Sequence, residues 1–162
     1  RKYLPAKGAP SDLGMSEFGW DPEEVLTKIQ VSGLNDGDIL RCEGATLRVL
    51  FTPGHANDHV CLFLEEEEAL FTGDNVLGWG TGTFQDLQLY MASLRRMQKT
   101  SPAILYPAHG PMIAGIKESA DWLQMYITHR EERIEQCLEA LRAAPAAGVD
   151  VMWLTRRIYE AQ

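Results

Sequence analysis

The sequence predicts an α/β fold with a layered core, and three observations lead to this class. Several short apolar runs end at Gly or Pro turns, as β-strands commonly do. Two longer segments, 86–99 and 117–142, repeat apolar residues at helical spacing. The order along the chain is strands, helix, strand, helix, which is typical of a sheet covered by a helical layer.

Composition narrows the class of protein. The chain has 162 residues, of which 45% are hydrophobic, enough for one domain with a core. A net charge of -8 argues against a broad basic surface for nucleic acid. No run approaches the roughly 20 apolar residues of a membrane span, so we expect no membrane partner.

The cysteines indicate a reducing compartment. The chain has three cysteines, Cys42, Cys61 and Cys137. An odd number of widely separated cysteines does not suit a disulfide framework. Cys42 and Cys61 lie in strand-like runs, and we predict both to be small buried side chains. Mitochondrial matrix and cytoplasm both fit reduced cysteines.

For the first 31 residues we predict a loop followed by one helix. Residues 1–20 carry several Pro and Gly without a period and are predicted to be loop. Asp21-Pro22-Glu23-Glu24 is a good helix start, with an N-cap, a first-turn proline and acidic residues. The chain begins without Met and without an apolar signal segment, and we interpret it as a fragment.

Five strands are expected between turn signals. Asn35-Asp36-Gly37-Asp38 predicts a hairpin turn between the runs 31–34 and 39–42, and Glu43-Gly44-Ala45 predicts a second turn. The acidic run 65–68 predicts a solvated hairpin tip. The predicted strands are 39–42, 46–51, 60–64, 69–72 and 104–106.

Three helices are expected after the first strands. Asp86 is predicted to cap a helix that ends at Lys99, and 117–142 predicts a long amphipathic helix. Residues 143–148 suggest a linker, after which Asp150 caps a short helix, 151–159. We therefore divide the chain into domains 1–142 and 143–162.

Three strand-to-turn junctions each carry a residue that binds metals. They are Thr52-Pro53-Gly54-His55, Phe71-Thr72-Gly73-Asp74 and Tyr106-Pro107-Ala108-His109-Gly110. Imidazole and carboxylate groups held at rigid turns are what a catalytic metal site needs. We predict that His55, Asp74 and His109 converge on zinc, with Asp74 suited to bridge two ions.

The neighbouring loop and its aromatic residue leave alternatives open. Residues 75–84 are rich in glycine, which suits either a close backbone approach beside the ligands or a plain connector. Trp79 in this loop would either flank a substrate or pack. His129 is predicted to lie on a solvated helix face.

These motifs resemble the second half of the metallo-β-lactamase superfamily. Thr-Pro-Gly-His, Thr-Gly-Asp and Tyr-Pro-x-His-Gly occur in the superfamily's order. The surrounding residues, roughly 33–160, are similar to the β-lactamase-like protein 2 group, whose members include mitochondrial single-strand-RNA endonucleases and fungal acyl-carrier-protein thioesterases. The resemblance implies the C-terminal half of an αββα sandwich over 1–142 and the start of a winged-helix-like domain over 143–162.

The resemblance also implies roles for individual residues. His55 would bind one zinc, Asp74 would bridge two and take part in catalysis, and His109 would bind the second. His59 is not a direct ligand in the family; we interpret it as acting beside the ligands or on the substrate, with a purely structural role left open.

Some features depart from the family pattern. Ala56 stands where Thr is usual, and Ala108 stands where Gly is usual. The superfamily's His-x-His-x-Asp-His motif does not occur in the chain, so we expect the chain alone to bind zinc weakly and not to catalyse.

The sequence thus predicts part of a binuclear zinc hydrolase that uses a metal-bound hydroxide. A single-strand-RNA endonuclease is the first prediction, and hydrolysis of an acyl-carrier or glutathione thioester is the alternative. A non-catalytic half-domain or interaction module is the alternative of another class, and a homodimer is one assembly that the sequence allows.

Overall fold

The computed structural model describes residues 32–159 of the chain. The chain divides into two compact units, Arg1–Asn35 and Asp36–Gln162, and all described helices and strands belong to the second. The predicted loop 1–20 and the predicted helix from Asp21 lie outside the described residues.

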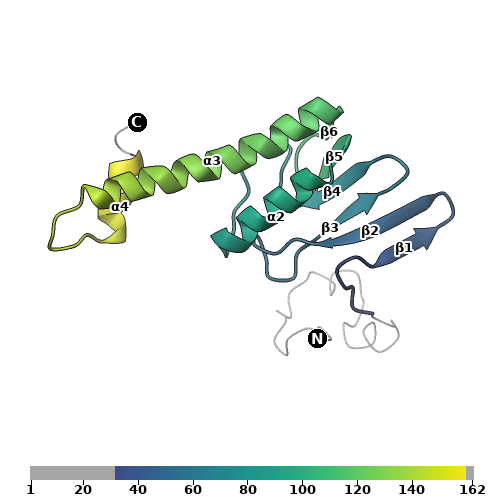
Figure 1. Cartoon of the computed structure of the whole chain (residues 1–162), viewed down its shortest axis with the longest axis horizontal. Coiled ribbons are helices and arrows are strands. Elements are labelled where there is room, and N and C mark those ends of the chain that lie inside the picture. The colour runs from purple at the N-terminus through teal and green to yellow at the C-terminus, as the bar shows by residue number, and fades with distance from the viewer. Residues whose placement is uncertain (1–31, 160–162) are drawn as a thin grey trace, which may run out of the picture. The chain divides into compact units, whose positions relative to one another are not determined.

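The second unit is built on a six-stranded sheet with the strand order β1-β2-β3-β4-β5-β6 (Figure 1). All neighbouring strands are antiparallel except β4 and β5, which are parallel. The five predicted strands are confirmed to within one residue at each end; β6 was not predicted because two residues carry no periodic signal. The strands are β1 (Ile39–Cys42), β2 (Ala45–Phe51), β3 (Val60–Leu64), β4 (Ala69–Gly73), β5 (Ile104–Pro107) and β6 (Ile113–Ala114).

Strand direction brings three chain positions to one end of this sheet. β2 and β4 are each antiparallel to β3 and therefore run the same way. β5 is parallel to β4 and follows that direction. The carboxyl ends of β2, β4 and β5 consequently meet at the same end of the sheet.

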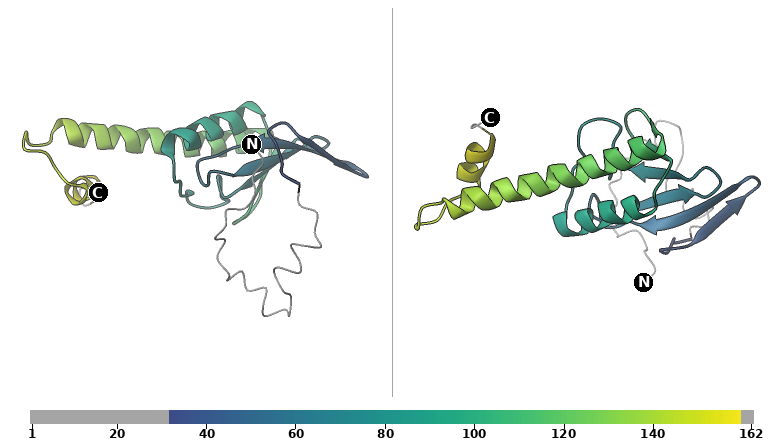
Figure 2. Two further views of the ribbon diagram at one scale, coloured as in Figure 1. Left: turned by 90° about the horizontal axis from the view of Figure 1, so that it is seen from below. Right: turned by 45° about the horizontal axis from the view of Figure 1, so that its top comes forward.

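Helices α2 (Leu87–Lys99) and α3 (Ile116–Arg142) lie on one side of the sheet (Figure 2). The Asp86 side chain accepts a hydrogen bond from the backbone N–H of Leu89, which confirms the predicted cap. The short helix α4 (Val151–Tyr159) starts after Asp150, whose carboxylate accepts from the N–H of Trp153. The predicted domain boundary after residue 142 stays a prediction.

The core lies between the sheet and the two long helices. Apolar side chains of the sheet alternate toward the helices, as the period of two requires. The fully buried residues of this core include Cys61, Leu70, Tyr90, Leu94, Met97, Leu105, Leu123 and Tyr126.

The two strand cysteines have different environments. Burial raises the pKa of the Cys61 thiol to about 12, so this residue is the small buried side chain that was predicted. The prediction was wrong for Cys42, which is exposed. Cys42 lies on β1, a strand whose four residues are all exposed.

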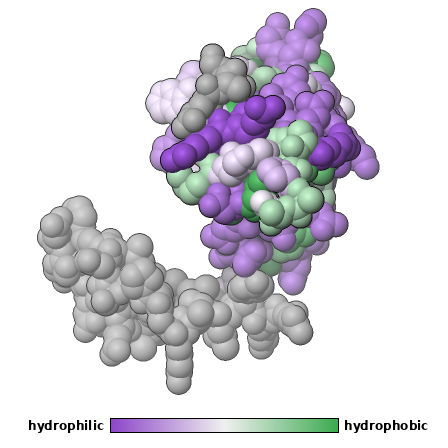
Figure 3. Space-filling view, turned by 90° about the vertical axis from the view of Figure 1, so that its left-hand side faces the viewer, coloured by the Kyte–Doolittle hydropathy of each residue, from purple (hydrophilic) through white to green (hydrophobic). Residues whose placement is uncertain are grey.

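The far half of α3 buries less of its apolar face than its periodicity predicts. Leu138 and Leu141 are 41% and 48% exposed, because α3 continues beyond the sheet and has α4 beside it there (Figure 1). Ala140 and Ile158 are buried in this region. Viewed from this end, green apolar patches lie among purple hydrophilic ones (Figure 3). No described helix combines the length and the apolar character that crossing a membrane requires.

Candidate metal centre

The three predicted ligands come together at the shared carboxyl end of β2, β4 and β5. His55 follows β2, Asp74 directly follows β4, and His109 follows β5. The Nε2 atom of His55 lies 3.8 Å from Oδ2 of Asp74, and Nε2 of His109 lies 3.4 Å from Oδ1. The two imidazoles therefore face different oxygens of one carboxylate.

The three side chains offer atoms of the kinds that bind metals. Two imidazole nitrogens and a carboxylate are suitable donors for zinc and similar ions. Within residues 32–159, no group of three or more His, Cys, Asp or Glu side chains closes around a single ion. The contacts instead form two His–Asp pairs that share Asp74, and a shared carboxylate is the group that can touch two metals at once. The donor types suit zinc, and the role of His55, Asp74 and His109 as zinc ligands stays a prediction.

The orientation of His55 is set by a backbone carbonyl. Its Nδ1 lies 2.9 Å from the carbonyl oxygen of Thr83. A carbonyl can only accept, so Nδ1 carries the proton and Nε2 keeps its lone pair on the side of Asp74. Such a contact at the second ring nitrogen is a common support of a metal-binding histidine.

The glycine-rich loop makes a close backbone approach and is not a plain connector. A Cβ added at Gly78 would lie 2.1 Å from the carbonyl oxygen of Pro111, and one at Gly110 would lie 2.8 Å from the Cα of Gly78. The N–H of Gly78 donates to the carbonyl of His109 at 2.8 Å. The loop that orients His55 through Thr83 thus also holds the turn of His109.

Arg130 on α3 fixes the same loop from the helical layer. Its guanidinium donates to the carbonyl of Gly82 and lies 5.0 Å from the ring centre of Phe84 and 5.7 Å from that of Tyr90. The Tyr90 hydroxyl donates to the carbonyl of Asn75 at 2.5 Å, and burial raises its pKa to about 12. Sequence reasoning missed Arg130 because it lies 48 residues from Gly82 and no local pattern distinguishes it.

His59 sits next to the candidate ligands but is held differently. Its Nδ1 lies 3.0 Å from Oγ1 of Thr52 and 3.1 Å from Nδ2 of Asn75. Its Nε2 is buried and has no hydrogen-bond partner among the described residues. Burial is the main cause that lowers the pKa of His59, and a positive charge on the nearby His55 would lower it further.

The structure shows whether Ala108 is strained and whether Trp79 packs in the core, which the sequence left open. Ala108 is not among the described non-glycine residues with positive φ, so its turn accommodates a side chain without strain. Its N–H donates to the carbonyl of Gly73 at 3.2 Å. Trp79 is 62% exposed, which excludes the reading that it packs in the core.

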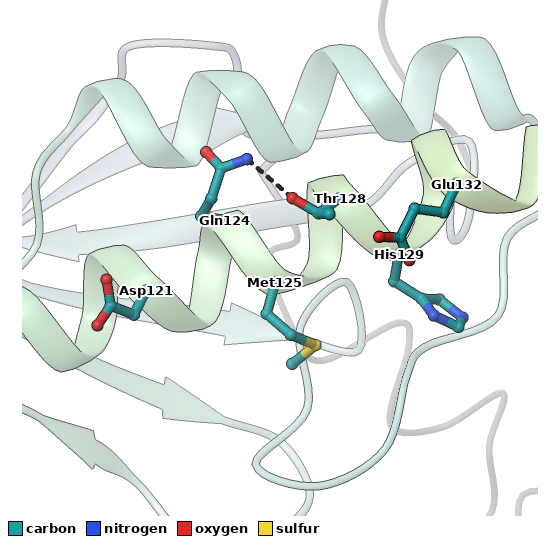
Figure 4. Close-up of a pocket in the computed structure, with 6 residues that line it drawn as sticks. All are labelled: Asp121, Gln124, Met125, Thr128, His129 and Glu132. Carbon is teal, nitrogen blue, oxygen red and sulfur yellow. Dashed lines mark hydrogen bonds between the residues drawn. The ribbon is translucent and has the colours of Figure 1, made fainter. Parts of the chain in front are cut away.

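A separate hollow runs along the surface of α3 (Figure 4). His129 lines it and is half-buried rather than fully solvated, and Gln124 donates to Thr128, one turn further along α3, at 3.1 Å. None of its lining residues is a candidate ligand, so we place the chemistry at the strand ends. The residues that line the hollow are Asp121, Gln124, Met125, Thr128, His129 and Glu132.

Sequence similarity shows the family to which the chain belongs. Residues 2–109 match the family model described as the metallo-beta-lactamase superfamily, and the chain belongs to this superfamily, a family of hydrolases. A solved structure of a metallo-beta-lactamase family protein from Thermus thermophilus matches 93% of this chain and 55% of its own chain, with a TM-score of 0.65 and 24% identity. At this identity the likeness shows the fold alone.

Fungal proteins are more similar in sequence. The lactamase-like protein adaB of Aspergillus niger is 50% identical over 113 residues, which are 70% of this chain and 35% of that protein. The atrochrysone carboxyl ACP thioesterase AgnL7 of Paecilomyces divaricatus is 48% identical over 108 residues, which are 67% of this chain and 33% of that protein. The chain spans about a third of the length of these relatives.

Proposed function

We propose that the chain supplies one side of a zinc centre that hydrolyses a thioester. The observation that carries the proposal is the pair of histidine Nε2 atoms, 3.8 and 3.4 Å from the two oxygens of Asp74. The thioester is favoured because a relative at 48% identity is named as an acyl-carrier-protein thioesterase.

Each residue has a definite part in this proposal. His55, Asp74 and His109 would hold the metal, and a bound zinc supplies hydroxide at neutral pH. Thr83 keeps the lone pair of His55 on the side of Asp74. The exposed ring of Trp79, next to Gly78, offers apolar surface to an acyl chain.

An RNA endonuclease is the second candidate and rests on the group resemblance of the sequence. A protein that tracks a phosphate backbone needs clustered Lys and Arg. The chain has 15 such residues against 23 acidic ones. This balance supports the thioester over the phosphodiester.

The test compares both substrates on the product of the gene that encodes the chain, after loading with zinc. We expect release of free thiol from an acyl-acyl-carrier-protein thioester, no cleavage of labelled single-stranded RNA, and loss of thiol release in Asp74→Asn. RNA cleavage that Asp74→Asn abolishes would reverse the order of the two candidates. A product that binds no zinc would support the non-catalytic interaction module.

A further inference from the structure

His59 and its buried neighbours form an arrangement that the proposed ligand roles do not explain. Thr52 and Asn75 are both fully buried, and both contact the same ring nitrogen of His59. The other nitrogen, Nε2, lies against Gly73. A Cβ added at Gly73 would lie 2.5 Å from this Nε2, so the strand end leaves just enough room for the ring.

The hydrogen bonds determine which way the Asn75 amide points. Nδ2 of Asn75 lies 2.7 Å from the carbonyl oxygen of Thr52. A carbonyl only accepts, so a flipped amide would place two acceptors in contact at this distance. The amide nitrogen is therefore the atom that faces both the Thr52 carbonyl and the ring of His59.

The amide in turn determines the tautomer of His59. The same Nδ2 lies 3.1 Å from Nδ1 of His59, and it brings a second N–H to that contact. Nδ1 must then accept, which leaves the ring proton on Nε2. His55 is in the opposite state, because its Nδ1 donates to the carbonyl of Thr83.

We propose that Asn75 is a positioning residue that holds His59 as a hydrogen-bond donor, and not as a metal ligand, at the edge of the centre. The Nε2 atom lies against Gly73, the residue before Asp74, and has no hydrogen-bond partner among the described residues. Because a buried donor without an acceptor is unfavourable, the acceptor is an oxygen atom of the group bound at the centre. This last step rests on the proposed function, whereas the tautomer assignment does not.

The experiment reads the protonated nitrogen of each imidazole by long-range ¹H–¹⁵N correlation NMR on the labelled chain. We expect a proton on Nε2 of His59 and on Nδ1 of His55 in one spectrum, with His59 assigned by loss of its signals in His59→Gln. In Asn75→Ala the His59 signals should redistribute between both tautomers. Thr52→Val removes the hydroxyl contact with the same ring nitrogen and keeps the carbonyl, so it separates the part of Thr52 from that of Asn75. If Thr52→Val redistributed the signals and Asn75→Ala did not, Thr52 and not Asn75 would set the tautomer.

Three results would overturn the proposal. They are a proton on Nδ1 of His59 in the unmodified chain, an unchanged tautomer in a folded Asn75→Ala, and loss of the Nε2 proton when zinc is added. The spectrum of the unmodified chain and its zinc titration decide the matter even where Asn75→Ala does not fold. Zinc that leaves His55 and His109 unperturbed, with the tautomer of His59 as expected, would count against the proposed function alone.

Discussion

The two ends of the strands differ in how the chain holds its turns. At the histidine end, defined by His55, Asp74 and His109, turns that are distant in sequence lock into one another. At the acidic end, the hairpin tip 65–68 is exposed to solvent and lies at the opposite end of β3 and β4 (Figure 1).

The forces at the two ends are also different. The histidine end contains the fully buried polar residues Thr52, Thr72 and Asn75, each of which makes a hydrogen bond. The acidic end relies on partly exposed contacts, such as the 2.6 Å ion pair between Arg48 and Glu65. Buried contacts tolerate little change, whereas exposed ion pairs contribute about 0–1 kcal/mol, so the two ends should respond very differently to substitution.

The largest effect is expected where the glycine-rich loop crosses the His109 turn. Gly78→Ala places a methyl group 2.1 Å from a backbone oxygen that cannot move independently. We expect a loss of about 3 kcal/mol in the free energy of unfolding, measured by urea denaturation. Gly33→Ala meets no atom within 4 Å and is the control. Equal stability of the two variants would contradict the close approach.

The second-largest effect is expected for Arg130, which holds the same glycine-rich loop from α3. Arg130→Ala removes a hydrogen bond to Gly82 and a cation–π contact with Phe84, for an expected loss of about 2 kcal/mol. Arg95→Ala removes an exposed ion pair with Glu131 and should lower stability by no more than ~1 kcal/mol. Thermal unfolding of both variants is the measurement, and a reversed order would show that Arg130 does not hold the loop.

Metal affinity tests the histidine end directly. Asp74→Asn removes the carboxylate that both histidines face and should weaken zinc binding by ~10-fold or more, measured by competition with a chromophoric chelator. His129→Ala changes a histidine in the α3 hollow and should leave the affinity unchanged. If the second variant weakened binding as much as the first, the zinc would reside outside the predicted centre.

The smallest effect is expected at the acidic end. Glu67→Gln alters an exposed side chain at the hairpin tip and should change the free energy of unfolding by less than about 0.5 kcal/mol. Zinc affinity should also stay the same. A clear change in either quantity would mean that the two ends of the strands are coupled.

Local sequence signals determined most of the elements of the described region. The Asp86 cap and the apolar repeat that includes Tyr90 and Leu94 placed α2, because both act within a few residues. The strands of the β1–β2 and β3–β4 hairpins followed from alternation and turn residues. The hairpin predicted at residues 35–38 was wrong, because residues 32–35 form no strand and β1 pairs with β2 instead. Cys42 was misjudged because a strand pattern does not say whether a helix covers that strand.

The candidate ligands were predicted from their turns, but their supports were not. His55, Asp74 and His109 each follow an apolar run, which is visible along the sequence. Arg130 acts on Gly82 across 48 residues, and Asn75 acts on His59 across 16. Only the folded chain brings such pairs together.

The sequence by itself determined the strand ends, the helix caps and the residue types at the three turns, since propensity and periodicity are local properties. The tertiary structure decided three further matters: that β2, β4 and β5 end at one place, that Gly78 and Gly110 lie against each other, and that the Nδ1 atoms of His55 and His59 meet different partners. These depend on strand direction, on backbone distance and on which acceptor a ring meets, and each is set by residues far apart in the chain.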